Sequence, residues 1–349
     1  MSMQLKKMKK MKKKFKILSI DGGGIKGVYP AQFLELIEAK LQGRTDGKEK
    51  LHQHFDLITG TSTGGIIALA IAMGIPAKEI KNLYLDNCKS IFGKKRSIIR
   101  RLFNAKHDNK FLEQLIRNKF KEYNNGNDPI LNDCLTDVCI PIYDLNKGEP
   151  SVLKTRYHEN FVRDYHIPIY QVAMATSAAP TYFNAYTSKY IEMDGSTEKI
   201  FANKIDGGVM ANNPTLVALL EALKAFGKEL SEIEVLSLGT GVMSFGDSKS
   251  RKHWGLKYWL NISSPRIFDL FMNSQSQLVD NYLSLLYQGI DKSEIANPNF
   301  VYDRITTILA KDNYIDMDEK DYERVSNYSE LGSISFQEKG RVIMEKHFY

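Results

Sequence analysis

One segment limits the folds open to this chain more than any other. It is Gly60-Thr61-Ser62-Thr63-Gly64, which joins an apolar run at 55–59 to a second apolar run at 66–73. A G-x-S-x-G string at a strand-to-helix junction is typical of a nucleophile elbow, in which the glycines permit a sharp turn that presents the serine hydroxyl. The second run is apolar on every side and is followed by a glycine and a proline, as expected of a buried helix. Ser62 is therefore the candidate nucleophile. The alternative is that the glycines serve close packing and Ser62 only caps the helix.

A second glycine-rich turn, DGGGIKG at 21–27, follows an apolar run at 15–20 that predicts a strand, and it precedes an amphipathic helix. Its spacing satisfies the G-x-G-x-x-G fingerprint of dinucleotide-binding folds. That fingerprint also needs an acidic residue about 20 positions later, at the end of a second strand. Residues 43–54 are polar and have no strand pattern, so this nucleotide-binding alternative lacks its partner.

The same turn has a second interpretation. The backbone N–H groups of Gly22, Gly23 and Gly24 can point into one concavity and form an oxyanion hole, since no side chain obstructs a substrate there. Neighbouring parallel strands would bring this turn and Ser62 to the same edge of a sheet. The two motifs therefore support each other.

A third glycine turn, Asp206-Gly207-Gly208, follows a predicted strand at 201–205 and leads into a helix that Asn213 and Pro214 would begin. Asp206 is thus an acid on a glycine turn. Further predicted elements are strands at 138–143, 151–154 and 233–239 and helices at 172–180, about 264–287 and near 342–344.

A basic patch interrupts the helical segments between 78 and 123. Apolar residues alternate in it with Lys94, Lys95, Arg96, Arg100 and Arg101. The patch is either a membrane-facing or lid segment or a solvated basic face beside core residues.

The net charge of +7 is concentrated at one end of the chain. Residues 1–16 hold eight lysines and no acid, which leaves a charge of about −1 for the rest of the chain. A nearly neutral body argues against a nucleic-acid-binding fold, whose basic residues would cover a folded face. Residues 1–14 are predicted to be a basic, disordered tail.

The three cysteines, Cys88, Cys134 and Cys139, are odd in number and lack C-x-x-C spacing. We therefore expect free thiols in a reducing, cytoplasmic compartment. No run of about 18 apolar residues occurs, and no apolar signal-peptide region follows the lysine-rich start. We expect neither a transmembrane helix nor a secretory signal.

Taken in order, the motifs resemble the patatin-like phospholipase family. The matching pieces are DGGGIKG (21–27), GTSTGG (60–65), the stretch from IPIYDL (140–145) to ATSAAPTYF (175–183), DGGVMANNP (206–214) and VLSLGTG (235–241). The match covers residues 15 to about 241. Residues 242–349 match less clearly, and we expect them to be a mainly helical region of a single domain that spans 15–349.

The resemblance implies a three-layer α/β/α fold with a mainly parallel central sheet, and lipid acyl hydrolysis by a Ser-Asp dyad. The dyad carries onto Ser62 and Asp206, with Asp21, Lys26, Gly27, Gly60, Thr63, Gly64, Gly207 and Gly208 as supporting residues of the three motifs. The histidines agree with a dyad, because none of the seven sits on a glycine turn or at a strand end. The best candidate among them for a histidine base is His253, in RKHW (251–254). A carboxylate with an ordinary pKa near 4 is a weak base for serine, so the dyad requires a dry, preformed site.

The resemblance also implies a membrane phospholipid as substrate and peripheral contact with membranes, with no cofactor and no metal. Lys26 stands where related cytosolic phospholipases carry an arginine that faces the headgroup phosphate. Some bacterial relatives are switched on by small nucleotides or partner proteins. A non-catalytic lipid-binding relative is a further alternative, against which the complete dyad argues.

Overall fold

The computed structural model describes residues 13–93, 96–97, 104–242, 255, 259, 266–288, 299–309 and 313–349. Its centre is an eight-stranded sheet with the order β5-β6-β3-β2-β1-β7-β8, in which β4 also pairs with β3. The strands are β1 (Phe15–Ile20), β2 (Leu57–Gly60), β3 (Asp137–Asp144), β4 (Glu149–Lys154), β5 (Tyr186–Ile191), β6 (Glu198–Asp206), β7 (Ile233–Leu238) and β8 (Val301–Ile305).

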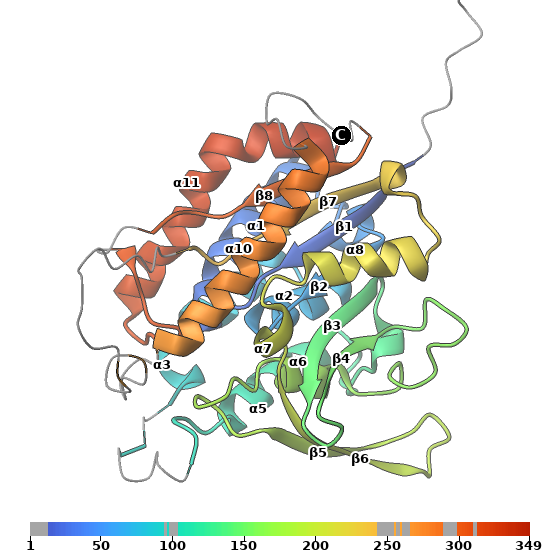
Figure 1. Ribbon diagram of the computed structural model, residues 1–349, viewed down its shortest axis with the longest axis vertical. Coiled ribbons are helices and arrows are strands. Elements are labelled where there is room, and N and C mark those ends of the chain that lie inside the picture. Colours follow the sequence, from blue (N-terminus) through green and yellow to red (C-terminus); the bar gives the residue numbers. More distant parts are fainter. Residues whose placement is uncertain are drawn as a thin grey trace, which may run out of the picture.

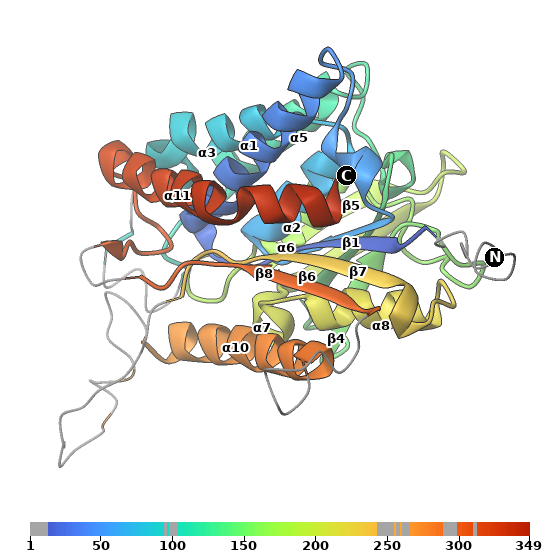
Figure 2. The same cartoon turned by 90° about the horizontal axis from the view of Figure 1, so that it is seen from above.

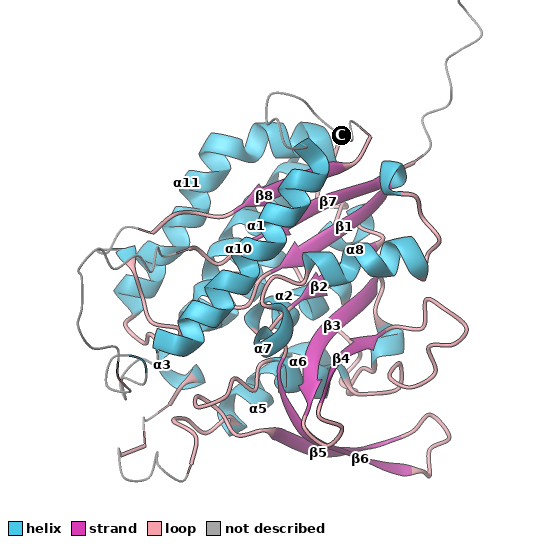
Figure 3. Cartoon of the chain, in the orientation of Figure 1, coloured by secondary structure: helices cyan, strands magenta, loops and turns pink. Residues whose placement is uncertain are grey.

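The five strands β3, β2, β1, β7 and β8 run parallel to their neighbours in this order. By contrast, β4 and β6 run antiparallel to β3, and β5 runs antiparallel to β6. Figure 3 shows β5 and β6 as a hairpin at one end of the sheet. The predicted mainly parallel sheet is confirmed.

Helices cover both faces of the sheet (Figures 1 and 2). One layer consists of α1 (Val28–Arg44), α2 (Thr63–Ala72), α3 (Ala77–Ile91), α5 (Lys110–Glu122), α6 (Ile169–Thr176) and α11 (Tyr322–His347). The other consists of α7 (Gly208–Ala211), α8 (Thr215–Lys224) and α10 (Arg266–Gln288). Figure 2 shows the sheet between the two layers. The three-layer fold that the resemblance implied is confirmed.

Strand β1 carries apolar residues that point to both faces of the sheet. Leu18 and Ile20 point into the core beneath α1, α2 and α11, whereas Phe15 and Ile17 point into the core beneath α8 and α10. A parallel strand that is covered by helices on both faces has no polar side to alternate with. The position of β1 at the centre of the sheet therefore follows from its composition.

The structure adds two strands that the sequence analysis did not predict. Strand β5 pairs with β6, and β8 pairs with β7 inside the region that was expected to be mainly helical. Helix α6 ends at Thr176, earlier than the predicted proline stop at residue 180. No described helix is both long and apolar enough to cross a membrane.

Several predictions fall on residues that the structure does not describe. They concern most of the basic tail (1–12) and most of the basic patch (94–95 and 98–103).

Candidate active site

The candidate site lies where the ends of β1, β2 and β6 meet. Strands β1 and β2 are parallel neighbours, so the glycine-rich turn after β1 and the turn after β2 leave the same edge of the sheet. A Cβ added at Gly22 would lie 3.3 Å from the Cβ of Ser62. The structure therefore brings the two predicted turns into contact.

Asp206 reaches this place from the opposite direction. Strand β3 pairs with β2 through Thr59 and then continues past the end of β2. Its extension pairs antiparallel with β6, so that Asp206 lies opposite Ile142. The carboxylate thus arrives at the level of Ser62 on a strand that runs back toward the site.

The backbone of Ser62 is strained. Its φ of 55° and ψ of −124° lie in a region that a residue with a Cβ rarely adopts. The Ser62 N–H donates to Thr176 Oγ1 at 3.1 Å, and Thr176 Oγ1 in turn donates to the Pro141 carbonyl at 2.7 Å. Thr61 Oγ1 donates to the Ala211 carbonyl at 2.6 Å, which ties this turn to the segment that follows Asp206. These contacts hold the strained conformation in place.

Asp206 is completely buried. Its Oδ1 accepts the Gly208 N–H at 2.7 Å, while Oδ2 has no well-formed hydrogen bond to any described residue. Burial raises the pKa of Asp206 to about 7, against a lowering by the Ser62 hydroxyl and the Gly208 N–H. A carboxylate whose pKa lies near neutrality can act as a general base at physiological pH. The expected dry environment is what moves this carboxylate out of its ordinary range.

The glycine-rich turn is held on all sides. The Gly22 N–H donates to the Asn212 carbonyl at 3.0 Å, so this group is already engaged and is not free for an oxyanion. Thr240 Oγ1 donates to the Gly22 carbonyl at 2.7 Å. Gly24 has a φ of 59°, and a Cβ there would lie 2.4 Å from the Met317 carbonyl oxygen. Within the described chain, no acceptor is found for the N–H of Gly23 or Gly24.

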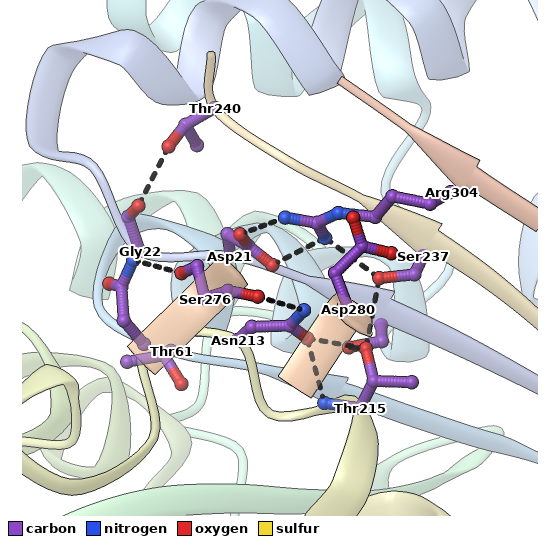
Figure 4. A network of polar contacts seen from close by, with 12 residues as sticks. Asp21, Gly22, Thr61, Asn213, Thr215, Ser237, Thr240, Ser276, Asp280 and Arg304 are labelled. Carbon is purple, nitrogen blue, oxygen red and sulfur yellow. Dashed lines mark hydrogen bonds and ion pairs between the residues drawn. The ribbon is translucent and has the colours of Figure 1, made fainter. Parts of the chain in front are cut away.

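A buried ion pair fixes the start of this turn (Figure 4). Arg304 Nη1, from β8, donates to Asp21 Oδ1 at 2.8 Å and to Ser237 Oγ at 2.8 Å, while its Nη2 binds Asp21 Oδ2. Both side chains are less than one-tenth exposed. The sequence analysis missed Arg304, because nothing around it distinguishes it from a surface arginine.

Lys26, the expected contact of the headgroup phosphate, lies among protein side chains. Its Nζ lies 4.7 Å from the centre of the Tyr314 ring. Burial lowers the pKa of Lys26, and the charges of Asp269 and Asp316 oppose this. The lysine therefore sits beside protein carboxylates.

The remaining motif glycines pack against other backbone or side-chain atoms. A Cβ would come within 2.4 Å of another atom at each of Gly27, Gly60, Gly64, Gly207 and Gly208. Close packing, which was the alternative role of Gly60 and Gly64, is thus present together with the elbow. Thr63 Oγ1 donates to the hydroxyl of Tyr84 at 2.6 Å.

An apolar pocket opens beside Ser62. Its lining comprises Gly24, Ile25, Ser62, Thr63, Ile66, Tyr84, Ile91, Phe92, Leu112, Ser177, Ala179, Tyr182, Phe183 and Met317. No histidine lines this pocket in the part of the chain that the structure describes, and His253 lies outside that part. The described residues also contain no cluster of three or more His, Cys, Asp or Glu side chains that could hold a metal.

Several known proteins are similar to this chain in sequence. The profile of the patatin-like phospholipase family matches residues 18–219. Patatin-like protein 2 of Arabidopsis thaliana is 35% identical over 305 residues, which cover 78% of this chain and 72% of that protein. A cGAMP-activated phospholipase of Escherichia coli (strain TW11681) is 31% identical over 258 residues, which cover 70% of this chain and 67% of the relative.

Solved structures show only a distant likeness. VipD from Legionella pneumophila matches with a TM-score of 0.36 and 12% identity, over 92% of this chain and 67% of VipD.

Proposed function

This chain belongs to the patatin-like phospholipase family and is a lipid acyl hydrolase, and on that premise we propose that it cleaves fatty-acyl esters of membrane phospholipids with Ser62 as the nucleophile and Asp206 as its base. One observation carries the proposal. The strained Ser62 lines an apolar pocket, and its hydroxyl acts on the buried carboxylate of Asp206, whose pKa lies near 7.

In the proposed reaction, Asp206 removes the proton of the Ser62 hydroxyl while Oγ attacks the ester carbonyl carbon. The carbonyl π electrons move to the oxygen, where the N–H groups of Gly23 and Gly24 stabilise the negative charge. When the tetrahedral intermediate collapses, the C–O bond to the lysophospholipid breaks and Asp206 gives its proton to the leaving alkoxide. Water then attacks the acyl carbon while Asp206 removes one of its protons. The bond between that carbon and Ser62 Oγ breaks, Asp206 returns the proton to Oγ, and the fatty acid leaves.

We further propose that the activity depends on an activator. Two similar proteins, from Escherichia coli and Pseudomonas aeruginosa, bear the name cGAMP-activated phospholipase. A comparison of turnover with and without cGAMP tests this step on the intact chain. An unchanged rate at saturating cGAMP would exclude cGAMP as the activator, and other small nucleotides and partner proteins would be tested next.

The hydrolase proposal is tested by mass spectrometry of the products formed from mixed membrane lipids. The wild-type chain should release fatty acids and lysophospholipids, and Ser62→Ala and Asp206→Asn should each abolish release while they keep the wild-type circular dichroism. Because the two residues act as a unit, the double variant should be no worse than either single one. A fluorophosphonate probe should label Ser62. Near-normal turnover in Asp206→Asn would refute the dyad.

A further inference from the structure

Two apolar cavities lie side by side in the helical layer that carries the candidate site. The first is the pocket at Ser62. The second is lined by Ile66, Ala70, Ile75, Ile80, Leu83, Tyr84, Ile116, Lys119 and Phe120. Ile66 and Tyr84 line both cavities, and no other described residue does so.

The order of the lining residues along α2 and α3 shows that the cavities follow one another. On α2, Ile66 borders both cavities, and Ala70, one turn further from Ser62, borders only the second. On α3, Ile91 borders only the first cavity, Tyr84 borders both, and Ile80 borders only the second.

Helix α5 has the same order. Leu112 lines the first cavity, whereas Ile116 and Phe120, one and two turns later, line the second. The residues that line the two cavities therefore follow the same order on α2, α3 and α5. The cavities, of about 40 and 10 Å³, lie end to end and are separated by Ile66 and Tyr84.

Tyr84 is fixed where it separates the two cavities. Its hydroxyl accepts a hydrogen bond from Thr63 Oγ1 at 2.6 Å and donates to the Thr63 carbonyl at 3.3 Å. The side chain is 3% exposed. If the ring moved into the second cavity, the hydroxyl would lose both partners in apolar surroundings, at the cost of an unsatisfied buried polar group. The ring is thus a rigid partition.

We propose that Tyr84, together with Ile66, sets the maximum length of the fatty-acyl chain that the enzyme accepts. This inference rests on the proposed hydrolysis at Ser62. The acyl chain lies in the first cavity with its carbonyl at Ser62, and its methyl end stops at the Tyr84 ring. Longer chains would have to expel Tyr84 from its bonds with Thr63. Tyr84 and Ile66 are in this sense specificity-determining residues, because they separate the first cavity from the second.

The test measures kcat/KM for p-nitrophenyl esters from butyrate to palmitate and for phospholipids with matched acyl chains. Tyr84→Ala joins the two cavities. It should raise the ratio of long-chain to short-chain kcat/KM about tenfold or more, because one methylene group that fits an apolar pocket changes kcat/KM by about tenfold or more. The ratio within one variant is used since it cancels any uniform loss from the Thr63 contact. Ile66→Ala should shift the ratio in the same direction.

Three further variants separate the role of the ring from that of the second cavity. Tyr84→Phe keeps the ring but loses both hydrogen bonds to Thr63, so it should shift the ratio in the same direction as Tyr84→Ala but by less. Leu83→Ala enlarges only the second cavity and should also keep that optimum. Ala70→Leu refills the second cavity, so it should reverse the shift when it is combined with Tyr84→Ala.

The outcomes separate this inference from the proposed function. If Ser62→Ala retained butyrate hydrolysis, the proposed function would fail. If hydrolysis required Ser62 but folded Tyr84→Ala and Ile66→Ala both kept the wild-type chain-length optimum, the chain-length inference alone would be overturned. A shift in Tyr84→Ala that Ala70→Leu did not reverse would likewise count against it.

Discussion

Replacing Arg304 with methionine tests how strongly the region after residue 219 holds the glycine-rich turn. Methionine has a similar length but no charge, so Arg304→Met leaves Asp21 buried, 3% exposed, and without its cationic partner. Breaking a buried pair by removal of one partner costs about 3 to 5 kcal/mol in the free energy of unfolding. With an unfolding entropy of roughly 2.1 cal/mol/K per residue, this corresponds to a fall in Tm of roughly 4 to 7 °C.

The assay is a double-mutant cycle in urea with Asp21→Asn as the second change. The double variant buries no unpaired charge. Its free energy of unfolding should therefore be higher than that of Arg304→Met alone. Arg324→Met is the matched control, because Arg324 pairs with Glu319 and is 54% exposed. It should cost less than about 1 kcal/mol. If the losses from Arg304→Met and Asp21→Asn simply added, the two side chains would not be coupled and the reasoning would be refuted.

Five further predictions concern other parts of the chain. Because Asp206 must be ionised to accept a proton, kcat should rise with pH through about 7 and then level off; a flat profile across that range would contradict the buried base. Replacing Gly23 with alanine should raise the activation free energy of the kcat step by about 3 to 4 kcal/mol, because an oxyanion donor is lost. Calorimetry should detect no binding of NAD. Contacts with Asp303 and Glu234 raise the pKa of His347 in the folded state although burial lowers it. The contribution of His347 to the free energy of unfolding should therefore be complete below the pKa of the unfolded state, about 6.5, and should disappear as the pH rises through the pKa of the folded state. In His347→Gln, urea unfolding curves should no longer show this pH dependence. Deletion of residues 2–13 should weaken flotation with anionic vesicles at low salt, since each lysine near such a surface contributes about 1 kcal/mol; equal flotation of both forms would exclude a membrane anchor.

The parts of the fold and site that could be predicted from sequence are those with local signals. Strand β1, the turn at Ser62 and helix α2 are each marked by adjacent residues, namely an apolar run, paired glycines and a glycine-proline stop. The parallel arrangement then followed from the order of strands and helices. The glycine turns at 21–27 and at Ser62 could be assigned to one site because parallel strands end at a common edge, whereas Asp206 was assigned to it through the family resemblance.

The rest depends on contacts between distant segments. Strand β6 approaches the site antiparallel, through an extension of β3 that no local pattern marks. The pairing of Arg304 with Asp21 joins residues 283 positions apart. The raised pKa of Asp206 arises from burial beneath several elements, which its neighbours in sequence do not reveal. The engagement of the Gly22 N–H by Asn212 is a contact of the same kind.

The position of β7 has a consequence for anyone who shortens this chain. Because β7 lies between β1 and β8, a fragment that stopped at residue 219 would turn β1 from a central strand into an open edge. Leu18 and Ile20 would remain in such a fragment, beside a row of unpaired N–H and C=O groups that invites strand addition and aggregation. The match to the family profile ends at residue 219, but we expect a fragment that stays in solution to need β7 and β8 as well. Screening for a minimal enzyme should therefore begin with fragments that retain both strands.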